Sequence, residues 1–354
     1  MEPKAITPDD ISVTGDRPTG RLHLGHYAGS LVTRLALQER CRQVVLIADL
    51  QALTDHAAAG GQVGDSVLEV ALDYLAVGID PARSMICLQS EVPELLELSA
   101  LYANVVSVAR LERNPTIREE QRLRGFARDM PVGFLAYPVS QAADITGFGA
   151  TVVPCGADQL PMIELANEVV RAVHFLAGRP ILCEVRATPG RAARLPGVDG
   201  SAKMSKSLGN AVALATPPDG VRACVRRMYT DPGHVRAGDP GTVEGNVVFS
   251  YLDAFDSDAE GVAALKAAYR HGGLADTVVK ARLERVLEEL LAPIRERRIV
   301  LAARPDDVID VIRDGTRRAR ALATPILARV RDVFGLGRLG RRAAAAAAAA
   351  HRRG

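Results

Sequence analysis

The sequence predicts an α/β fold: a Rossmann-like parallel sheet with helices on both faces, followed by an all-helical C-terminal domain. Short, continuously apolar runs alternate with helical patterns between residues 11 and 176. Such runs are typical of parallel strands buried on both faces, and their alternation with helices favours a parallel sheet. After Asn210 the pattern becomes mainly helical. With 354 residues, the chain is long enough for two domains.

The elements of the first quarter follow from periodicity. Residues 11–15 form a short apolar run that predicts a strand ending at a glycine. Residues 23–41 carry leucines and a tyrosine near helical spacing and predict a helix. Residues 44–48 are continuously apolar, as expected of a buried parallel strand. Residues 67–77 predict a helix that Gly78 ends.

The same alternation continues to the middle of the chain. Residues 85–89 predict a strand and residues 94–111 a helix. Residues 132–145 are helical in pattern. Residues 151–155 predict a strand that leads into a helix over residues 158–176. In parallel sheets of this kind, the ligand lies beyond the carboxyl ends of the strands, at a switch point in strand order.

The domain division is expected near residue 212, before the break at residues 216–220. We expect a nucleotide-binding catalytic domain over residues 10–212 and a helical domain over residues 213–340. Residues 341–354 are an alanine- and arginine-rich tail of low complexity, to which we assign no function.

Composition indicates a globular cytoplasmic protein, with 48% hydrophobic and 24% charged residues. No apolar stretch reaches the ~18 residues of a membrane span, and the N-terminus lacks a signal-peptide pattern. Five scattered cysteines without a Cys-x-x-Cys pair are typical of reduced thiols and do not predict a metal site.

Charge is unevenly placed along the chain. Residues 281–354 hold 17 Arg against 9 Asp and Glu, a balance of +8 within a net charge of +2. This balance fits an RNA-binding surface. It fits equally well arginine-rich helices with pairs such as Arg285 and Glu289 at i, i+4 spacing.

A turn rich in small and polar residues precedes the first predicted helix. Pro18-Thr19-Gly20 turns the chain, and His23 and His26 follow three residues apart on one helix face. Helix N-termini and histidine donors suit a triphosphate, and Gly25 leaves room for a nucleotide close to the backbone. The alternatives are a helix cap with exposed histidines or, less well supported, a metal site.

A second motif lies 180 residues downstream of the first (203 minus 23). Lys203-Met204-Ser205-Lys206-Ser207 has two lysines among small polar residues, a pattern that cannot pack as core. Lys203 and Lys206 on a mobile loop would neutralise pyrophosphate as it leaves ATP. Mg²⁺ would share that charge while riding on the phosphates, so no protein-held metal is expected. The alternative is an ordinary surface loop with solvated lysines.

Together these motifs resemble the two signatures of class I aminoacyl-tRNA synthetases. His23-Leu24-Gly25-His26 resembles the HIGH signature, and residues 203–207 match KMSKS letter for letter. The resemblance spans residues 12–335 and is closest to the tryptophanyl branch, in a divergent bacterial second form. It implies catalytic roles for His23, His26, Lys203 and Lys206. The implied ATP-binding residues are Arg17, Pro18, Thr19, Gly25, His26, Gly156, Ala157, Asp158, Lys203, Met204, Ser205, Lys206 and Ser207.

The amino-acid pocket is expected on the helix over residues 132–145. Tyr137, Gln141 and Asp144 share one face at i, i+4 and i+7. A buried carboxylate can accept the indole N–H, a donor without an acceptor. The resemblance implies that Asp144 holds the indole nitrogen and that Tyr137 and Gln159 hold the ammonium group. It also implies that Val153 and Cys155 face the ring. The alternative is a packed helix with one capped aspartate.

Partners and competing functions follow from the resemblance. It implies L-tryptophan and tRNA(Trp) as substrates, an anticodon-binding helical domain, a homodimer and no membrane. Gln141 stands where the tryptophanyl branch usually has methionine, and a glutamine with an aspartate three residues on is also the tyrosyl pattern. A tyrosyl-tRNA synthetase is therefore the second hypothesis. A synthetase paralogue without charging activity and a small-molecule nucleotidylyltransferase are the others.

Overall fold

The computed structural model describes residues 5–56, 60–126, 130–156, 159–189, 195–201, 204 and 209–337. Its strands are β1 (Ile11–Asp16), β2 (Arg42–Ile47), β3 (Ser84–Leu88), β4 (Val152–Cys155) and β5 (Arg186–Pro189). The helices before β4 are α1 (Leu24–His26), η1 (Tyr27–Leu31), α2 (Val32–Leu37), α3 (Asp49–His56), α4 (Gly60–Val77), η3 (Gln89–Glu91), α5 (Pro93–Tyr102), α6 (Val108–Glu112), α7 (Pro115–Arg124) and α8 (Val132–Gly147). The later helices are α9 (Leu160–Ala177), α10 (Pro218–Arg227), α11 (Val247–Phe255), α12 (Ala259–His271), α13 (Asp276–Ala302) and α14 (Pro305–Val333).

The five described strands form one parallel sheet in the order β3-β2-β1-β4-β5. The chain builds β1, β2 and β3 outward in one direction and then returns to place β4 on the other side of β1. Strand order therefore reverses between β1 and β4, and this switch point is where a crevice opens at the carboxyl ends. The sheet confirms the fold class predicted from the sequence.

Both faces of the sheet are buried, because side chains alternate along each strand. In β2, Val45 and Ile47 join the apolar cluster that includes α4 and α13, whereas Val44 and Leu46 join the one that includes α5, α8 and α9. These four β2 side chains are at most 3% exposed. Burial on both faces explains why the strands appear in the sequence as unbroken apolar runs.

Several element boundaries differ from the sequence prediction. The helix expected over residues 23–41 ends at Leu37 and contains a π-helical turn, η1. The helix expected over residues 94–111 is broken, because the Asn104 amide bonds the carbonyls of Ala100 and Leu101 and Ser107 caps a new helix, α6. The short elements α3, α7 and β5 were not predicted; each has fewer than eleven residues and few apolar side chains.

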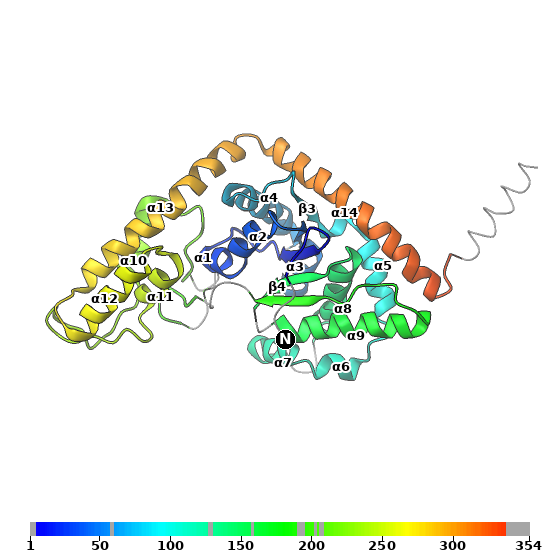
Figure 1. The fold of residues 1–354 in the computed structure, drawn as a ribbon, viewed down its shortest axis with the longest axis horizontal. Coiled ribbons are helices and arrows are strands. Elements are labelled where there is room, and N and C mark those ends of the chain that lie inside the picture. The colour runs from blue at the N-terminus through cyan, green and yellow to red at the C-terminus, as the bar shows by residue number, and fades with distance from the viewer. Residues whose placement is uncertain are drawn as a thin grey trace, which may run out of the picture.

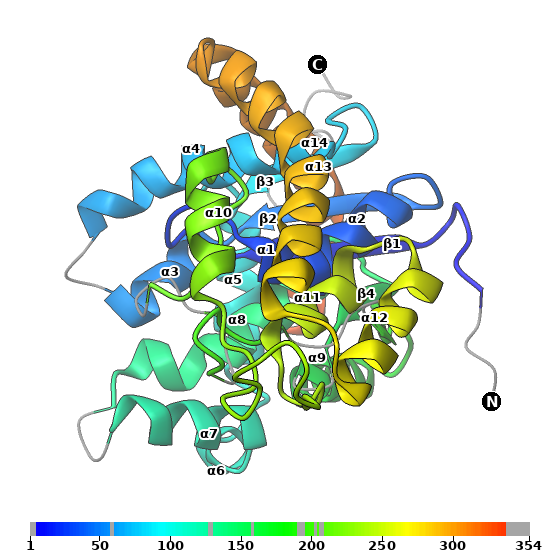
Figure 2. The same cartoon turned by 90° about the vertical axis from the view of Figure 1, so that its left-hand side faces the viewer.

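Two long helices form an arch over the molecule (Figure 1). From the top of the arch, α13 descends to the lobe made by α10, α11 and α12, and α14 runs down the opposite side past β3 and α5. Figure 2 shows α13 crossing in front of the sheet with α10 and α12 beside it. The last helix therefore returns to the sheet, although it lies in the portion that the sequence assigns to the helical domain.

Helix α14 covers the edge of the sheet at β3. The Thr316 hydroxyl accepts a hydrogen bond from the backbone N–H of Leu88 at 3.1 Å. A Cβ on Gly315 would overlap the carbonyl oxygen of Ile86, so the helix approaches the strand backbone as closely as glycine allows. An edge strand with unpaired backbone groups invites pairing with other chains, and α14 removes that hazard here.

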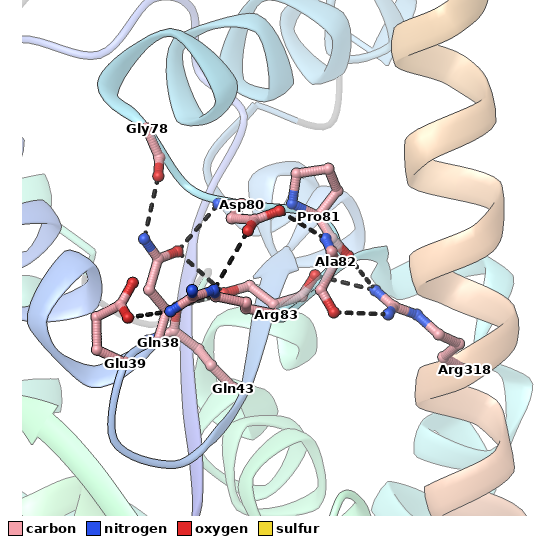
Figure 3. A network of polar contacts seen from close by, with 10 residues as sticks. Gln38, Glu39, Gln43, Gly78, Asp80, Pro81, Ala82, Arg83 and Arg318 are labelled. Carbon is pink, nitrogen blue, oxygen red and sulfur yellow. Dashed lines mark hydrogen bonds and ion pairs between the residues drawn. The ribbon is translucent and has the colours of Figure 1, made fainter.

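The turn that leads into β3 is held from two sides (Figure 3). On one side the Gln38 amide donates to the Gly78 carbonyl at 3.1 Å, and its oxygen accepts from Asp80 N–H at 3.0 Å. On the other side Arg318 of α14 donates to the carbonyls of Pro81 and Ser84, at 2.6 and 3.1 Å. Local turn chemistry and a distant helix thus fix the same segment.

Most of the described arginines in α13 and α14 pair with carboxylates of the same molecule. The predicted pair Arg285–Glu289 is present at 4.0 Å. Other pairs are Arg282–Asp256, Arg295–Glu288, Arg298–Asp73, Arg313–Asp310, Arg318–Asp314, Arg320–Glu94 and Arg331–Glu97. Internal pairing accounts for much of the arginine-rich pattern, and RNA contact by this region stays a prediction. Across the described ranges, none of the helices has the length and apolar character needed to cross a membrane.

Candidate active site

A cleft of about 870 Å³ opens at the carboxyl ends of β1 and β4. Its floor is formed by the last residues of those strands, with β2 behind them. Helices α1, α2, α3, α7 and α8 supply the walls, and Met204 reaches the cleft from the lysine-rich motif. The cleft therefore lies at the switch point where the topology places a ligand.

A buried ion pair supports the floor of the cleft. Arg34 is 2% exposed, and its guanidinium donates to Asp16 Oδ2 at 2.7 Å. The Tyr74 hydroxyl donates to the same oxygen at 2.7 Å. Burial alone would raise the pKa of Asp16, but the charges of Arg34 and His26 and the hydrogen bonds from Arg34 and Tyr74 together outweigh it and hold that pKa well below its usual range. Asp16 is therefore a fixed anion at the end of β1.

Both histidines of the first motif are held by backbone donors. Gly25 N–H donates to His23 Nδ1 at 3.1 Å, and His23 N–H donates to His26 Nδ1 at 3.2 Å. The two rings lie 3.9 Å apart between centroids. Since each Nδ1 accepts a hydrogen bond, each ring carries its proton on Nε2. Both imidazoles line the cleft with a defined tautomer.

Gly25 is required by the histidine itself. A Cβ at this position would lie 2.9 Å from Cε1 and Nδ1 of the His23 ring. A distance below 3.0 Å forces a shift, so any larger residue would push His23 out of its cap position. This is a different reason from the one inferred from the sequence, which gave the space to the nucleotide.

The two signature motifs meet in the fold. Leu24 N–H donates to the Val212 carbonyl at 2.9 Å, and Leu214 N–H donates to the Leu22 carbonyl at 3.0 Å. Met204 is 5% exposed, and its Sδ would lie 3.4 Å from a Cβ placed on Gly25. Segments 180 positions apart in the chain (203 minus 23) therefore share one wall of the cleft.

The base of the lysine-rich segment is pinned on both sides. The Asn210 amide donates to Asp199 Oδ1 at 3.0 Å and to Ser201 Oγ at 2.7 Å. Tyr251 of α11 donates to the Pro196 carbonyl at 3.0 Å. The described residues on the two sides of the lysines are thus tied to each other and to α11.

The opposite end of the cleft is formed by α8 and β4. Tyr137, Gln141 and Asp144 of α8 all line it, as their helical spacing predicted. Further lining residues from the predicted amino-acid pocket are Val153, Cys155 and Gln159. The structure therefore gathers at one wall the whole set that the sequence assigned to the amino acid.

Asp144 is the most deeply buried polar group of that wall, at 4% exposure. Gln89 Nε2 lies 2.9 and 2.8 Å from its two carboxylate oxygens, and Gln51 Nε2 lies 2.6 Å from Oδ2. Burial raises the pKa of Asp144 to about 7, against the lowering effect of the Gln89 hydrogen bond. The carboxyl group therefore titrates near neutral pH, unlike Asp16 in the same cleft.

The predicted nucleotide residues fall into three groups. Arg17, Thr19, His23, His26, Gly156 and Met204 line the cleft. Of the described residues, Pro18 and Gly25 belong to the motif without lining the cleft. The remaining predicted residues lie outside the described part of the chain: Ala157, Asp158, Lys203, Ser205, Lys206 and Ser207.

Sequence reasoning missed several polar residues that line the cleft: Asp16, Arg34, Gln51, Thr54 and Glu120. Each lies outside the two signatures, on an element whose own pattern gives no chemical signal. Glu120 carries a buried Oε2 that makes no hydrogen bond with any residue that the structure describes. An unpaired buried carboxylate oxygen in a cleft marks a residue to test for contact with a cation.

Comparisons with known proteins agree with this geometry. The family described as "tRNA synthetases class I (W and Y)" matches residues 8–292. A tryptophan–tRNA ligase of Clostridium longisporum is 50% identical over 331 residues, which are 92% of this chain and 97% of the relative. A tryptophan–tRNA ligase of Streptococcus pneumoniae is 50% identical over 333 residues, 92% of this chain and 98% of the relative.

Solved structures give the same result. A tryptophanyl-tRNA synthetase of Campylobacter jejuni, complexed with ADP and tryptophan, aligns with a TM-score of 0.79 at 27% identity. The alignment covers 92% of this chain and all of that one. A tyrosyl-tRNA synthetase of Archaeoglobus fulgidus has a TM-score of 0.61 at 24% identity, covering 82% of this chain and 90% of that one, so the tyrosyl branch shares the fold.

A parallel sheet with a switch-point cleft and two converging signature motifs is the arrangement of a class I aminoacyl-tRNA synthetase. The chain belongs to the family of class I tRNA synthetases for tryptophan and tyrosine. This membership confirms the family predicted from the sequence, and the curated relatives named above are all of the tryptophan type.

Proposed function

We propose that this protein ligates L-tryptophan to tRNA(Trp) with ATP, through a tryptophanyl-adenylate. The observation that carries the proposal is the 50% identity to tryptophan–tRNA ligases over 92% of the chain. At that identity and coverage, the cleft, both signature segments and α8 all lie within the shared region.

At the nucleotide end, His23 and His26 would donate from Nε2 to phosphate oxygens. Support for this role comes from the backbone donors that occupy both Nδ1 atoms and so direct the ring protons to Nε2. A donor already fixed before the reaction costs no reorganisation when charge builds on the phosphates. The tryptophan carboxylate would attack the α-phosphorus, and the bond to pyrophosphate would break.

Lys203 and Lys206 would neutralise the leaving pyrophosphate. Both lysines lie outside the described residues, so this role rests on the motif and on its neighbours. Met204, between them in sequence, is buried against the first motif, which supports delivery of the two ammonium groups to this end of the cleft. Loss of either lysine should slow adenylate formation far more than it weakens tryptophan binding.

At the amino-acid end, Asp144 would accept the indole N–H. Tyr137 and Gln159 would hold the ammonium group, with Gln141 beside them on the same wall and Val153 and Cys155 against the ring. The burial of Asp144 supports this assignment, because a substrate without a matching donor would leave a buried carboxylate unpaired.

Magnesium would be carried on the ATP phosphates, whose oxygens are the hard ligands it prefers. Of the cleft carboxylates, Asp16 is occupied by Arg34 and Tyr74, and Asp144 by two glutamines. Glu120 keeps one oxygen that makes no hydrogen bond with any described residue, so it is the cleft carboxylate that could contact the phosphate-bound ion. Bound in this way, the ion would add to the charge neutralisation that the lysines supply.

The wider setting follows from the family. We expect a cytoplasmic homodimer in which the lobe of α10–α13 binds the anticodon end of the tRNA. Splayed anticodon bases would supply specificity and arginine–phosphate contacts affinity.

The test is exchange of labelled pyrophosphate into ATP, run with tryptophan and tyrosine side by side. Tryptophan alone should support exchange, and the protein should then charge a tRNA(Trp) transcript. Exchange with tyrosine alone would transfer the assignment to the tyrosyl branch. Exchange with neither amino acid would mean a protein that no longer activates substrate.

A further inference from the structure

A closed ring of hydrogen bonds surrounds the carboxylate of Asp144. Three elements contribute to it: Gln51 from α3, Gln89 from η3 and Asp144 from α8. Gln51 N–H donates to Gln89 Oε1 at 3.3 Å, which turns the Gln89 amide nitrogen toward Asp144. The Gln51 side chain then closes the ring on Oδ2 at 2.6 Å.

The ring also provides a hydrogen-bond acceptor for a backbone N–H group in the first turn of α3. Gln51 lies in the first turn of α3, where backbone N–H groups have no partner within the helix. Gln89 Oε1 supplies that partner, and Ser90 N–H in turn donates to Asp49 Oδ1 at 2.9 Å. These bonds dock α3 against η3 and so place the Gln51 side chain at the cleft.

The ring also decides which lone pairs of Asp144 are taken. A carboxylate offers about four acceptor positions over two oxygens. Among the described residues, Oδ2 receives both Gln51 and Gln89, whereas Oδ1 receives Gln89 alone, at 2.9 Å. Oδ1 therefore keeps more capacity for a donor that enters the cleft. Because both partners are neutral amides, neither of them cancels the negative charge of the carboxylate when it is ionised.

We propose that Gln51 is a positioning residue for substrate recognition: it occupies Oδ2 of Asp144 and thereby directs the indole N–H of tryptophan to Oδ1. The inference rests on the proposed function, since it concerns the same pocket. It assigns a role to a residue outside both signature motifs and outside the predicted substrate set.

Two consequences separate this role from simple packing. Removing the Gln51 amide should weaken binding of a ligand with an indole N–H and spare a ligand without one. It should also move the titration of tryptophan binding to higher pH, because a hydrogen bond to the ionised form of a carboxyl group lowers its pKa. Asp49 and Cys87 face the same carboxyl group and are unchanged by the substitution.

The experiment compares tryptophan with β-(3-benzothienyl)alanine, in which sulfur replaces the indole N–H. Amino-acid affinity is measured from pyrophosphate exchange between pH 6 and 9 for the wild type, Gln51→Met and Gln51→Leu. Leu53→Ala is the control, since Leu53 lies on the same helix with its side chain 37% exposed. Melting temperatures confirm folding, and two substitutions of different shape guard against one that fails to fold.

In both Gln51 variants we expect the preference for tryptophan over the sulfur analogue to fall roughly tenfold, as for one hydrogen bond to a charged group. The pH midpoint should rise, and Leu53→Ala should match the wild type. Parallel loss of both ligands, or an unchanged midpoint and preference, would overturn the inference. A wild type that shows no exchange with tryptophan would instead overturn the proposed function.

Discussion

Among single residues, the cleft holds two aspartates whose pKa values are shifted in opposite directions. Arg34 and Tyr74 hold Asp16 as an anion, with a pKa well below its usual range despite burial. Burial raises the pKa of Asp144 to about 7, because its partners are neutral amides. One carboxylate thus stays charged at the end of β1, and the other can lose its charge near neutral pH.

Tryptophan binding should therefore depend on pH through Asp144. An ionised carboxyl group is a stronger acceptor for the indole N–H than a neutral one, so affinity should fall as pH drops below about 7. At pH 6, one unit lower, only ~10% of the group is ionised, and affinity should drop roughly tenfold. Isothermal titration across pH 6–8 measures this. A flat profile would show that Asp144 keeps its charge throughout.

Asp144→Asn should weaken tryptophan binding and leave the folded protein as stable as the wild type or more stable. The folded-state pKa lies above the ordinary 3.8, so ionisation on raising the pH from about 4 to 7 costs folding free energy. Asparagine removes that cost, which is at most roughly 4 kcal/mol for three pKa units. At pH 8 we expect an equal or higher melting temperature with tryptophan affinity at least ~10-fold weaker. Unchanged tryptophan affinity would refute the pocket assignment, and ATP affinity is the internal control.

Gly25→Ala should disable the first motif with little effect on folding. The added Cβ would meet the His23 ring at 2.9 Å and displace its donor. Loss of one pre-positioned donor typically slows a reaction by roughly 100-fold or more, so pyrophosphate exchange should fall by that amount. Gly61→Ala on α4, where nothing lies within 4 Å of the new Cβ, is the matched control. Full activity in Gly25→Ala would mean that His23 has no fixed role.

At the scale of elements, the sequence predicts those whose signal is local. The strands β1 to β4 appear as apolar runs because both their faces are buried, and α8 is found within two residues of its end. The signals fail where a polar side chain interrupts a helical pattern locally, or where an element has no apolar run of its own. Asn104 and Ser107 break one predicted helix through backbone bonds, and the edge strand β5 has no apolar run to reveal it.

The contact between α14 and β3 can be tested at Gly315. A Cβ there would overlap the Ile86 carbonyl oxygen, so Gly315→Ala must push the helix off the strand and cost about 1–3 kcal/mol. Gly64→Ala in α4 is the control. It meets nothing within 4 Å and should stabilise by about 0.5–1 kcal/mol. Urea unfolding compares the two variants, and equal effects would argue against so close a contact.

At the scale of the whole molecule, the helical half is tied to the nucleotide motif through α4. Arg298 of α13 donates to Asp73 at 2.7 Å and to Glu69 at 2.5 Å. Asp73 also accepts the backbone N–H of Leu22 at 2.7 Å, one residue before His23, and Glu69 pairs with Arg21 at 2.6 Å. Helix α13 thereby helps to hold the turn that precedes the first signature motif.

Arg298→Met should lower the free energy of unfolding of the whole protein. Asp73 is fully buried, and burial raises its pKa even with Arg298 present. Without the arginine, an unpaired buried charge would cost about 3–5 kcal/mol. Protonation relieves that cost, so the loss should be larger at pH 8 than at pH 5.

Urea unfolding at the two pH values measures the effect of Arg298→Met. Arg313→Met, which breaks an exposed pair with Asp310, is the control and should cost under ~1 kcal/mol. Equal losses in the two variants would show that the buried network does not bind the halves together.

Part of the site was predictable, because some of its residues belong to patterns within a short stretch of sequence. The signatures and the α8 face are local patterns, and the fold brings both sets to one cleft. Gln51 and Gln89 were not predictable, because their link to Asp144 spans 93 and 55 positions and glutamine carries no signal of its own. Arg34 was not predictable either, because nothing in the sequence of its helix indicates that its guanidinium contacts Asp16.

We propose that one cleft at the carboxyl ends of β1 and β4 holds both tryptophan and ATP. The most direct measurement is a crystal structure with a non-hydrolysable tryptophanyl-adenylate analogue. We expect the indole nitrogen within about 3 Å of Asp144 Oδ1, and the phosphate oxygens facing Nε2 of His23 and His26. An analogue bound elsewhere, or bound here with its indole turned away from Asp144, would contradict it.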